Sequence, residues 1–533
     1  MHIVKPHWPL FAAAGLLFVI VTVQLTLSIR KNQGHFVYAL DDPYIHMAIA
    51  RNFARHGVWG VTRYEFSSST SSLMWTLLLA AAYFFTSSEY VPLIFNIACA
   101  IVLLAVAYSL LEPLSSFAKL ALISSLVLLL PLPALIFSGM EHTAHIALSL
   151  PLVYAAASVI TLEQIPLRRR RLWLLLLLSA FAPLVRYESL FLILPTALLV
   201  GLRRRFREAA LVLLVALVPL TVYGLISWSY GSSFLPNPLV LKGSMPRDGI
   251  LPFLQQALFK FRSAPHLWSM LLLAIWFFIG AKTPGRIGPA ERVLALIFIL
   301  ATVLHLLFAG IGWFYRYEAY LVAIGIMITG QSVFKALTGR KEDGAMRGAP
   351  LLPVTLTLAL SLVSGITLLV RANRAISDTI PAMKNIYNQQ YQMARFLETY
   401  YSGEAVAAND IGAINFMSDV RCLDLWGLGS VEVTRAKLAG AFNTIKIAEL
   451  ATSHQVRIAL LYSVWFQGDE SVPESWIKVG QWTIQECVVC GYPTVSFYAV
   501  DTNEADTLKQ NLQAFSAKLP ADVIQGGAYY ETK

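Results

Sequence analysis

Long apolar stretches fill most of the first 371 residues, and they constrain the fold more than any other feature of the chain. About 20 helical residues, at 1.5 Å each, cross the roughly 30 Å hydrocarbon core of a bilayer. Only 14% of the residues are charged and 57% are hydrophobic, whereas a soluble domain has about a quarter charged residues. The sequence therefore predicts a polytopic α-helical membrane protein. Candidate spans lie at 8–29, 72–87, 90–111, 118–137, 139–162, 171–185, 187–202, 207–229, 264–281, 290–309, 313–335 and 350–371.

Clusters of Lys and Arg between these stretches predict the orientation, because short loops rich in these residues stay in the cytoplasm. The clusters lie at 168–171, 203–207, 282–292 and 335–347, and Lys/Arg-poor connections alternate with them. The N-terminus is accordingly predicted to be cytoplasmic. The segments predicted outside are 31–71, 230–263, 310–318 and 372–533. The net charge of +10 follows from this inside bias, so no nucleic-acid partner is expected.

The number of spans follows from parity. An outside segment 31–71 and an inside cluster at 168–171 require an odd number of crossings, yet four apolar stretches lie between them. One of the four does not span, and both the short stretch 72–87 and the proline-interrupted stretch 118–137 are candidates. We expect about eleven transmembrane helices.

Two domains are predicted, a transmembrane domain at 1–371 and an extracytoplasmic α/β domain at 372–533. In the second, helical patterns at 376–401, 431–438 and 444–453 alternate with β-like runs at 405–408, 457–462 and 494–500. Three of the four cysteines, Cys422, Cys487 and Cys490, lie in this part of the chain. They predict a structural disulfide with one thiol left over, and the pairing stays open.

An acidic pair, Asp41-Asp42, follows the first span. Apolar residues recur at helical spacing from Pro43 to His56, which predicts an amphipathic helix at the membrane surface that ends at Gly57. Asp42 before Pro43 is typical of a helix cap. Asp41 has no such structural explanation, and a carboxylate beside a helix that carries Arg and His side chains suits proton abstraction next to a bound phosphate.

An ordered set of short motifs runs along nearly the whole chain. Asp41, Asp42, Tyr44 and Ile45 are followed by a Ser/Thr-rich turn at 67–72 and by Trp75, then by S-G-M-E-H-T at 138–143, R-Y-E at 186–188, P-N-P-L-V-L-K at 236–242 and R-Y-E at 316–318. The set resembles the GT-C superfamily of polyprenyl-phosphate-sugar glycosyltransferases. It is most similar to terminal arabinofuranosyltransferase-like and bacterial protein-mannosyltransferase-like members. Many such proteins have a proline before the Trp, which Ser72-Leu73-Met74-Trp75 lacks.

The resemblance implies an enzyme of the inner (cytoplasmic) membrane that transfers a sugar, with inversion, from undecaprenyl- or decaprenyl-phosphate to a hydroxyl of a glycan, lipid or protein at the outer face. The expected catalytic residues are Asp41 as general base and Asp42 as cap, second carboxylate or metal ligand, with the need for a divalent metal left open. The expected donor-phosphate ligands are Lys242, Arg316 and Arg186. The expected sugar or acceptor pocket contains Tyr44, His46, Arg51, Glu141, His142, Glu188 and Glu318. In the outside domain, Asp410 and Asp424 follow β-like runs, where either ligand binding or capping is expected.

Two other functions fit a polytopic chain of this kind. A transporter or flippase of lipid-linked sugars predicts charged residues deep inside the spans, whereas here they cluster at span ends. A ligase that uses a lipid-pyrophosphate donor predicts a large late outside loop rather than an acidic pair in the first one.

Overall fold

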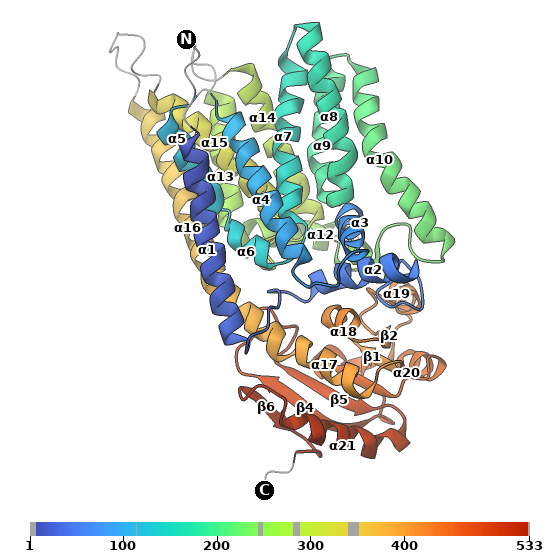
Figure 1. The fold of residues 1–533 in the computed structure, drawn as a ribbon. Helices are drawn as coiled ribbons and strands as arrows, with labels where there is room; N and C mark the ends of the chain where they lie inside the picture. Colours follow the sequence, from blue (N-terminus) through green and yellow to red (C-terminus); the bar gives the residue numbers. More distant parts are fainter. Residues whose placement is uncertain (1–6, 113, 244–248, 281–287, 339–350, 531–533) are drawn as a thin grey trace.

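A bundle of long helices makes up the N-terminal two thirds of the chain, and a smaller domain built on a β-sheet closes one end of it (Figure 1). The structure is a computed structural model, and it describes residues 7–112, 114–243, 249–280, 288–338 and 351–530. The N-terminal end of α1 and the C-terminal end of the chain lie at opposite ends of the molecule (Figure 1). The described bundle contains α1 (Trp8–Lys31), α2 (Asp42–His56), α3 (Leu73–Tyr83), α4 (Val91–Leu110), α5 (Ser116–Leu128), α6 (Leu132–Phe137), α7 (His142–Thr161), α8 (Ile165–Val185), α9 (Leu190–Leu202), α10 (Phe206–Ser229), α11 (Asn237–Lys242), α12 (Ile250–Ser263), α13 (Pro265–Gly280), α14 (Pro289–Phe308), α15 (Ala319–Thr338) and α16 (Leu351–Asn388).

The bundle is that of a membrane protein. Among the described residues, seven helices are long and apolar enough to cross a bilayer, or eight if the bent pair α12–α13 counts as one span. Three shorter apolar helices, Leu73–Tyr83, Tyr187–Leu202 and Ala319–Lys335, add to these. The predicted number of about eleven transmembrane helices therefore exceeds the seven or eight described helices that are long and apolar enough to cross a bilayer. The seven are Trp8–Lys31, Val91–Leu110, Ser116–Phe137, His142–Thr161, Phe206–Ser229, Pro289–Phe308 and Thr355–Tyr400.

The two stretches between which the parity argument could not choose differ clearly in length. Helix α3 has 11 residues, which rise only about 17 Å at 1.5 Å per residue. Ser116–Phe137 has 22 residues and is 67% buried inside the bundle. The first stretch is thus too short to cross about 30 Å of hydrocarbon, and the second is long enough.

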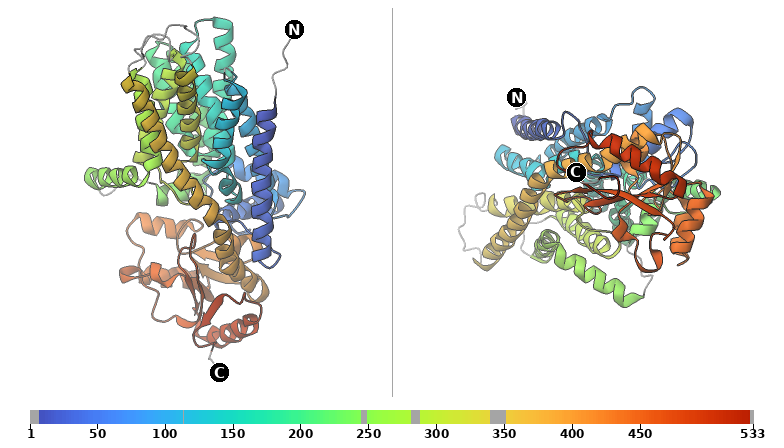
Figure 2. Two further views of the ribbon diagram at one scale, coloured as in Figure 1. Left: turned by 90° about the vertical axis from the view of Figure 1, so that its left-hand side faces the viewer. Right: turned by 90° about the horizontal axis from the view of Figure 1, so that it is seen from below.

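The arginine-rich start of α8 and the C-terminal end of α9, which Arg203, Arg204 and Arg205 follow, lie at the end of the bundle remote from the sheet domain (Figure 1). At the other end, α12 meets α13 at 88° and projects sideways from the bundle (Figure 2). Exposed apolar side chains such as Leu254 and Phe259 lie on α12. A helix of this kind is suited to lie in the interface plane of a bilayer.

The C-terminal domain is an α/β unit around a six-stranded sheet with the order β2-β1-β3-β5-β4-β6. The first three strands are parallel, and β5, β4 and β6 add to them antiparallel. The strands are β1 (Ala405–Ala408), β2 (Arg421–Asp424), β3 (Ile458–Leu461), β4 (Ile477–Ile484), β5 (Thr494–Ala499) and β6 (Val523–Gly526). The helices are α17 (Gln390–Tyr400), α18 (Gly412–Met417), α19 (Val431–Leu438), α20 (Thr444–Ser453) and α21 (Ala505–Ser516), and short 3-10 turns lie at Tyr187–Ser189, Ser463–Trp465, Gly468–Glu470 and Thr502–Glu504.

Alternating side chains of each strand pack on the two faces of the sheet, as the pleat requires. Val406 and Ala408 of β1 face the core that contains α17, α18 and α21, whereas Ala407 faces the core that contains α19 and α20. Ile45 and Ile49 of α2 join the first of these cores. The sheet domain is therefore packed directly on the helix that carries the acidic pair.

Helix α2 begins one residue before the predicted start and ends at His56, where Gly57, with a φ of 70°, forms a left-handed cap as expected. Its environment differs from the predicted amphipathic helix at the membrane surface. Tyr44, Met47 and Ala48 pack on the bundle while Ile45 and Ile49 pack on the sheet domain, so α2 is enclosed from both sides.

Candidate functional site

The side chain of Asp41 joins the bundle to the sheet domain. Its Oδ2 accepts a hydrogen bond from the backbone N–H of Gly412 at 2.6 Å, and its Oδ1 accepts one from Ala413 at 2.8 Å. These free N–H groups begin α18, where a carboxylate is stabilised. Burial raises the pKa of Asp41 well above its usual value, and the hydrogen-bonded neighbour Asp410 raises this pKa further.

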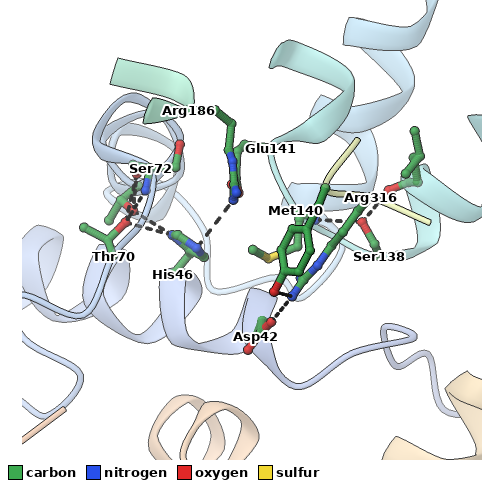
Figure 3. A network of polar contacts seen from close by, with 12 residues as sticks. Asp42, His46, Thr70, Ser72, Ser138, Met140, Glu141, Arg186 and Arg316 are labelled. Atoms are coloured by element: carbon green, nitrogen blue, oxygen red, sulfur yellow. Dashed lines mark hydrogen bonds and ion pairs between the residues drawn. The ribbon is translucent and has the colours of Figure 1, made fainter. Parts of the chain in front are cut away.

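Asp42 is not the cap that the sequence suggested. Helix α2 begins at Asp42, so the capping position falls to Asp41, and neither carboxylate caps α2 through its side chain. Instead Asp42 forms an ion pair with Arg316 (Figure 3), and it lies 3.8 Å from the ammonium of Lys242. Burial raises the pKa of Asp42, but the two cations outweigh burial and hold this pKa well below its usual range.

An unusual turn carries Arg316. Trp313, Phe314 and Tyr315 all have positive φ values, of 38°, 57° and 63°. Such a left-handed turn costs roughly 1–2 kcal/mol per residue, so other contacts must stabilise it. Arg371 of α16 donates to the carbonyl of Tyr315, and it donates to Glu318 at 3.0 Å.

Arg186 has two carboxylate partners rather than a free guanidinium. Its Nη1 lies 2.7 Å from Glu141 (Figure 3), and its Nε lies 3.0 Å from Glu188. His46 lies on the other side of Glu141, with 3.9 Å between Nε2 and Oε2, and its Nδ1 is 3.0 Å from the hydroxyl of Thr70. Because this cluster contains one guanidinium, that of Arg186, and two carboxylates, those of Glu141 and Glu188, it does not favour the binding of a further anion.

Two motifs that are far apart in the sequence meet at the carbonyl of Leu428. Ser69 of the Ser/Thr-rich turn donates to it at 2.7 Å, and Asn237 of the P-N-P motif donates to it at 3.0 Å. The backbone N–H of Asn237 in turn donates to the carbonyl of Ser68 at 2.8 Å. These contacts hold the sheet domain against the bundle beside the acidic pair.

A first cavity of about 380 Å³ opens at this junction. Its polar and charged lining includes Asp42, His46, Arg186, Glu188, Lys242 and Arg316. Its apolar lining includes Leu190, Phe191, Leu194, Leu235, Leu239 and Phe308. Cationic and apolar side chains in one cavity suit a ligand with an anionic head and a hydrocarbon tail.

A second cavity of about 300 Å³ lies between the bundle and the sheet domain. Asp41, Asp410, Gln390 and Asn409 supply its polar lining, and three tryptophans supply aromatic rings. The two cavities share a wall, because both are lined by Asp42, Ile45, Lys242, Tyr317 and Leu428.

The predicted site residues divide according to these cavities. Asp41, Asp42, Lys242, Arg316, Arg186, His46 and Glu188 line one or both of them. Tyr44, Arg51, Glu141, His142 and Glu318 line neither of these two cavities. Arg51 binds the carbonyls of Asn415 and Phe416 at the end of α18, and Glu318 is held by Arg371 and by the N–H of Gly312.

Arg371 and Trp465 gave no recognisable signal in the sequence. Arg371 ends an apolar stretch and resembled a flanking charge, yet it supports the turn of Arg316. Trp426 and Trp465 lie in the second cavity with ring centroids 5.0 Å apart. Of the two aspartates that follow β-like runs, Asp424 accepts hydrogen bonds from its own turn at Trp426 and Gly429, whereas Asp410 faces the cavity.

Among the residues that the structure describes, no three His, Cys, Asp or Glu side chains form a group that could hold a metal ion. The cysteine pairing that the sequence left open is local, because Cys487 and Cys490 form a disulfide while Cys422 is buried and free. The disulfide closes a loop whose Val489 and Gly491 line the second cavity.

Comparison with known proteins identifies the architecture. A domain of unknown function, DUF8728, matches residues 384–498, and no curated protein matches the sequence. The crystal structure of ArnT from Cupriavidus metallidurans in the apo state is similar at a TM-score of 0.51 and 12% identity, over 93% of this chain and 99% of that one. The chain has a GT-C fold.

The undecaprenyl-phosphate-bound form of the same ArnT is similar at a TM-score of 0.50 and 12% identity, over 92% of this chain and 99% of that one. The apo oligosaccharyltransferase of Archaeoglobus fulgidus gives a TM-score of 0.48 at 11% identity, over 98% of this chain and 76% of that one. The GT-C fold agrees with the predicted superfamily. It does not distinguish the arabinofuranosyltransferase-like subtype from others.

Proposed function

We propose that the chain is a membrane glycosyltransferase that moves a sugar from a polyprenyl-phosphate donor to an acceptor hydroxyl. The observation that carries this proposal is the shared wall of the two cavities. A cationic, partly apolar cavity and a polar, aromatic cavity meet at Asp42, Lys242 and Tyr317. Two substrates bound on either side of this wall would bring their reacting atoms together.

The first cavity is assigned to the donor. Arg316 and Lys242 face one carboxylate, that of Asp42, which leaves one positive charge to attract a phosphodiester. An arginine and a lysine also suit a phosphate that gains charge as it departs. The apolar side accepts the start of the prenyl chain, and the similar ArnT fold has been solved with undecaprenyl phosphate. Arg186 lines this cavity, but it is already paired with Glu141 and Glu188, so we do not assign it to the phosphate.

Asp41 is assigned as the general base. It lines the second cavity, on the acceptor side, so a base there and a phosphate in the first cavity would lie on opposite sides of the transferred sugar, as inversion requires. Its raised pKa also makes the Asp41 carboxylate a stronger base than a solvated one. Asp42 then balances part of the charge of Arg316 and Lys242.

The test is transfer from defined undecaprenyl-phosphate sugars by the purified full-length protein, with donor binding measured separately. Asp41→Asn is expected to lower kcat by about 100- to 10,000-fold, the usual worth of a general base, while donor binding persists. Equal transfer by wild type and Asp41→Asn would disprove the assignment of the base. Movement of the donor across a bilayer without transfer would favour a flippase.

Because Asp41 also holds α18, a loss of activity needs a control for disturbed docking. Arg51→Met removes the hydrogen bonds to Asn415 and Phe416 at the other end of α18, and Arg51 lies outside both cavities. We expect Arg51→Met to lower kcat by less than about tenfold. A loss as large as that of Asp41→Asn would assign Asp41 a docking role only.

A further inference from the structure

The second cavity has a lining that selects the chemistry of its ligand. Trp313 of the bundle and Trp426 and Trp465 of the sheet domain supply its aromatic surface. Trp313 and Trp465 remain 48% and 36% exposed, although both lie at the junction of two packed units. Aromatic rings left uncovered inside a cavity are available to a ligand.

The position of the Trp465 ring is fixed by its neighbours. Its Nε1 donates to the carbonyl of Gly491 at 3.3 Å, and the ring of Tyr462 packs at a centroid distance of 5.4 Å. Trp426 is covered on one side by the ammonium of Lys437, 4.3 Å from the ring centroid. The rings are thus positioned before a ligand arrives, which reduces the entropy lost on binding.

Two buried side-chain amides line the same cavity. In each of them, one of the two polar atoms has no hydrogen-bond partner among the described residues. Asn409 uses its Oδ1 to accept from the N–H of Tyr462, and Gln390 uses its Nε2 to donate to Asp410 at 2.7 Å. Asn409 Nδ2 and Gln390 Oε1 have no hydrogen-bond partner among the described residues, although the two side chains are only 5% and 1% exposed. Buried polar atoms of this kind normally have a partner, and leaving one unpaired costs about 1–3 kcal/mol.

We propose that the second cavity binds a neutral saccharide, which is the acceptor. A free donor N–H and a free acceptor oxygen match the hydroxyl group, which both donates and accepts. Tryptophan faces match the C–H-rich face of a sugar ring, because the ring face of an aromatic side chain is electron-rich. The carboxyl groups of Asp41 and Asp410, which line this cavity without a cationic partner of their own among its lining residues, disfavour an anionic ligand. That the saccharide is the acceptor rests on the proposed function, whereas the saccharide-binding site itself does not.

Binding of saccharides to the full-length protein in detergent tests the inference. The probes are linear tetrasaccharides of glucose, mannose, galactose and arabinose, with a galacturonate tetrasaccharide and a Ser/Thr-containing peptide as comparators. We expect saturable binding of at least one neutral saccharide, weakened about tenfold by Trp465→Leu and by Asn409→Ala. Trp173→Leu, an exposed tryptophan on α8 at the remote end of the bundle, is the matched control and should not change binding.

Three outcomes would overturn the inference: no neutral saccharide binds, saccharide binding is insensitive to Trp465→Leu and Asn409→Ala, or the peptide alone binds in a manner sensitive to them. Binding of undecaprenyl phosphate to the same preparations shows that they are folded. If saccharide binding succeeds but no sugar is transferred from any donor, the saccharide site stands and the proposed function fails.

Discussion

The carboxylate of Asp41 binds the backbone N–H of Gly412, 371 residues further along the chain, at 2.6 Å. A β-carbon at Gly412 would overlap the backbone oxygen of Asp41 and its side chain. The close approach of α2 and α18 therefore depends on a residue without a side chain. The position of Asp41 thus depends on contacts with the sheet domain as much as on contacts with the bundle.

Gly412→Ala is expected to push α18 away from Asp41. We expect kcat to fall by a larger factor than the factor by which KM changes. Overpacking of this kind costs typically about 1–3 kcal/mol. Hydrogen exchange of the amides in Gly412–Met417 should become faster. Gly365→Ala, in α16 and with open space around its β-carbon, is the control and should leave both measurements unchanged.

The acid limb of the pH profile should respond to Asp410. Burial and Asp410 both raise the pKa of Asp41, so removing the charge of Asp410 lowers this pKa. Because a base works only when deprotonated, the acid limb of kcat for Asp410→Asn should move to lower pH. Asp419→Asn, whose ion pair with Arg63 is exposed, should not move it. A shift to higher pH for Asp410→Asn would contradict the coupling of the two carboxyl groups.

Lys242→Met and Arg316→Lys should each weaken donor binding by roughly 10- to 100-fold, since a charge-assisted contact contributes about 1.5–3 kcal/mol. Arg316→Lys keeps the charge but loses the planar fork that contacts Asp42 and a phosphate. Binding of undecaprenyl phosphate at two ionic strengths is the measurement. The surface variant Arg63→Met should bind like wild type, and unaltered affinity in both site variants would move the phosphate elsewhere.

Arg371→Met should destabilise the protein by about 3–5 kcal/mol, because it leaves the buried carboxylate of Glu318 without its guanidinium. The double variant Arg371→Met/Glu318→Gln leaves no unpaired charge and should have a higher Tm than the single one. Both variants lose the hydrogen bond to Tyr315 and should therefore bind the donor more weakly than wild type.

Local patterns predicted much of the fold. Strand 405–408 and helices 431–438 and 444–453 agree with β1, α19 and α20, because alternation and helical spacing are properties of neighbouring residues. The number of spans was harder to predict. Apolar composition shows that a stretch is compatible with lipid, but it does not give the length of the helix. Helix α3 ends after 11 residues, which is too short to cross a bilayer.

The acidic pair was located by its sequence, but its contacts were not. Proline fits any position of a first helical turn, so the sequence placed the start of α2 one residue late and made Asp42 the cap. The partners of the pair are 274 and 371 residues away, at Arg316 and Gly412, beyond the reach of any spacing rule. Such contacts exist only once the bundle and the sheet domain are assembled.

Under the proposed function, the two cavities take their substrates from different phases. A lipid donor would reach Lys242 from the plane of the bilayer, whereas a saccharide would reach Trp465 from water. The donor concentration that matters is then a mole fraction in the membrane, and that of the acceptor is a molarity. Diluting the enzyme with inert detergent should slow turnover through the donor alone, and adding water should slow it through the acceptor alone.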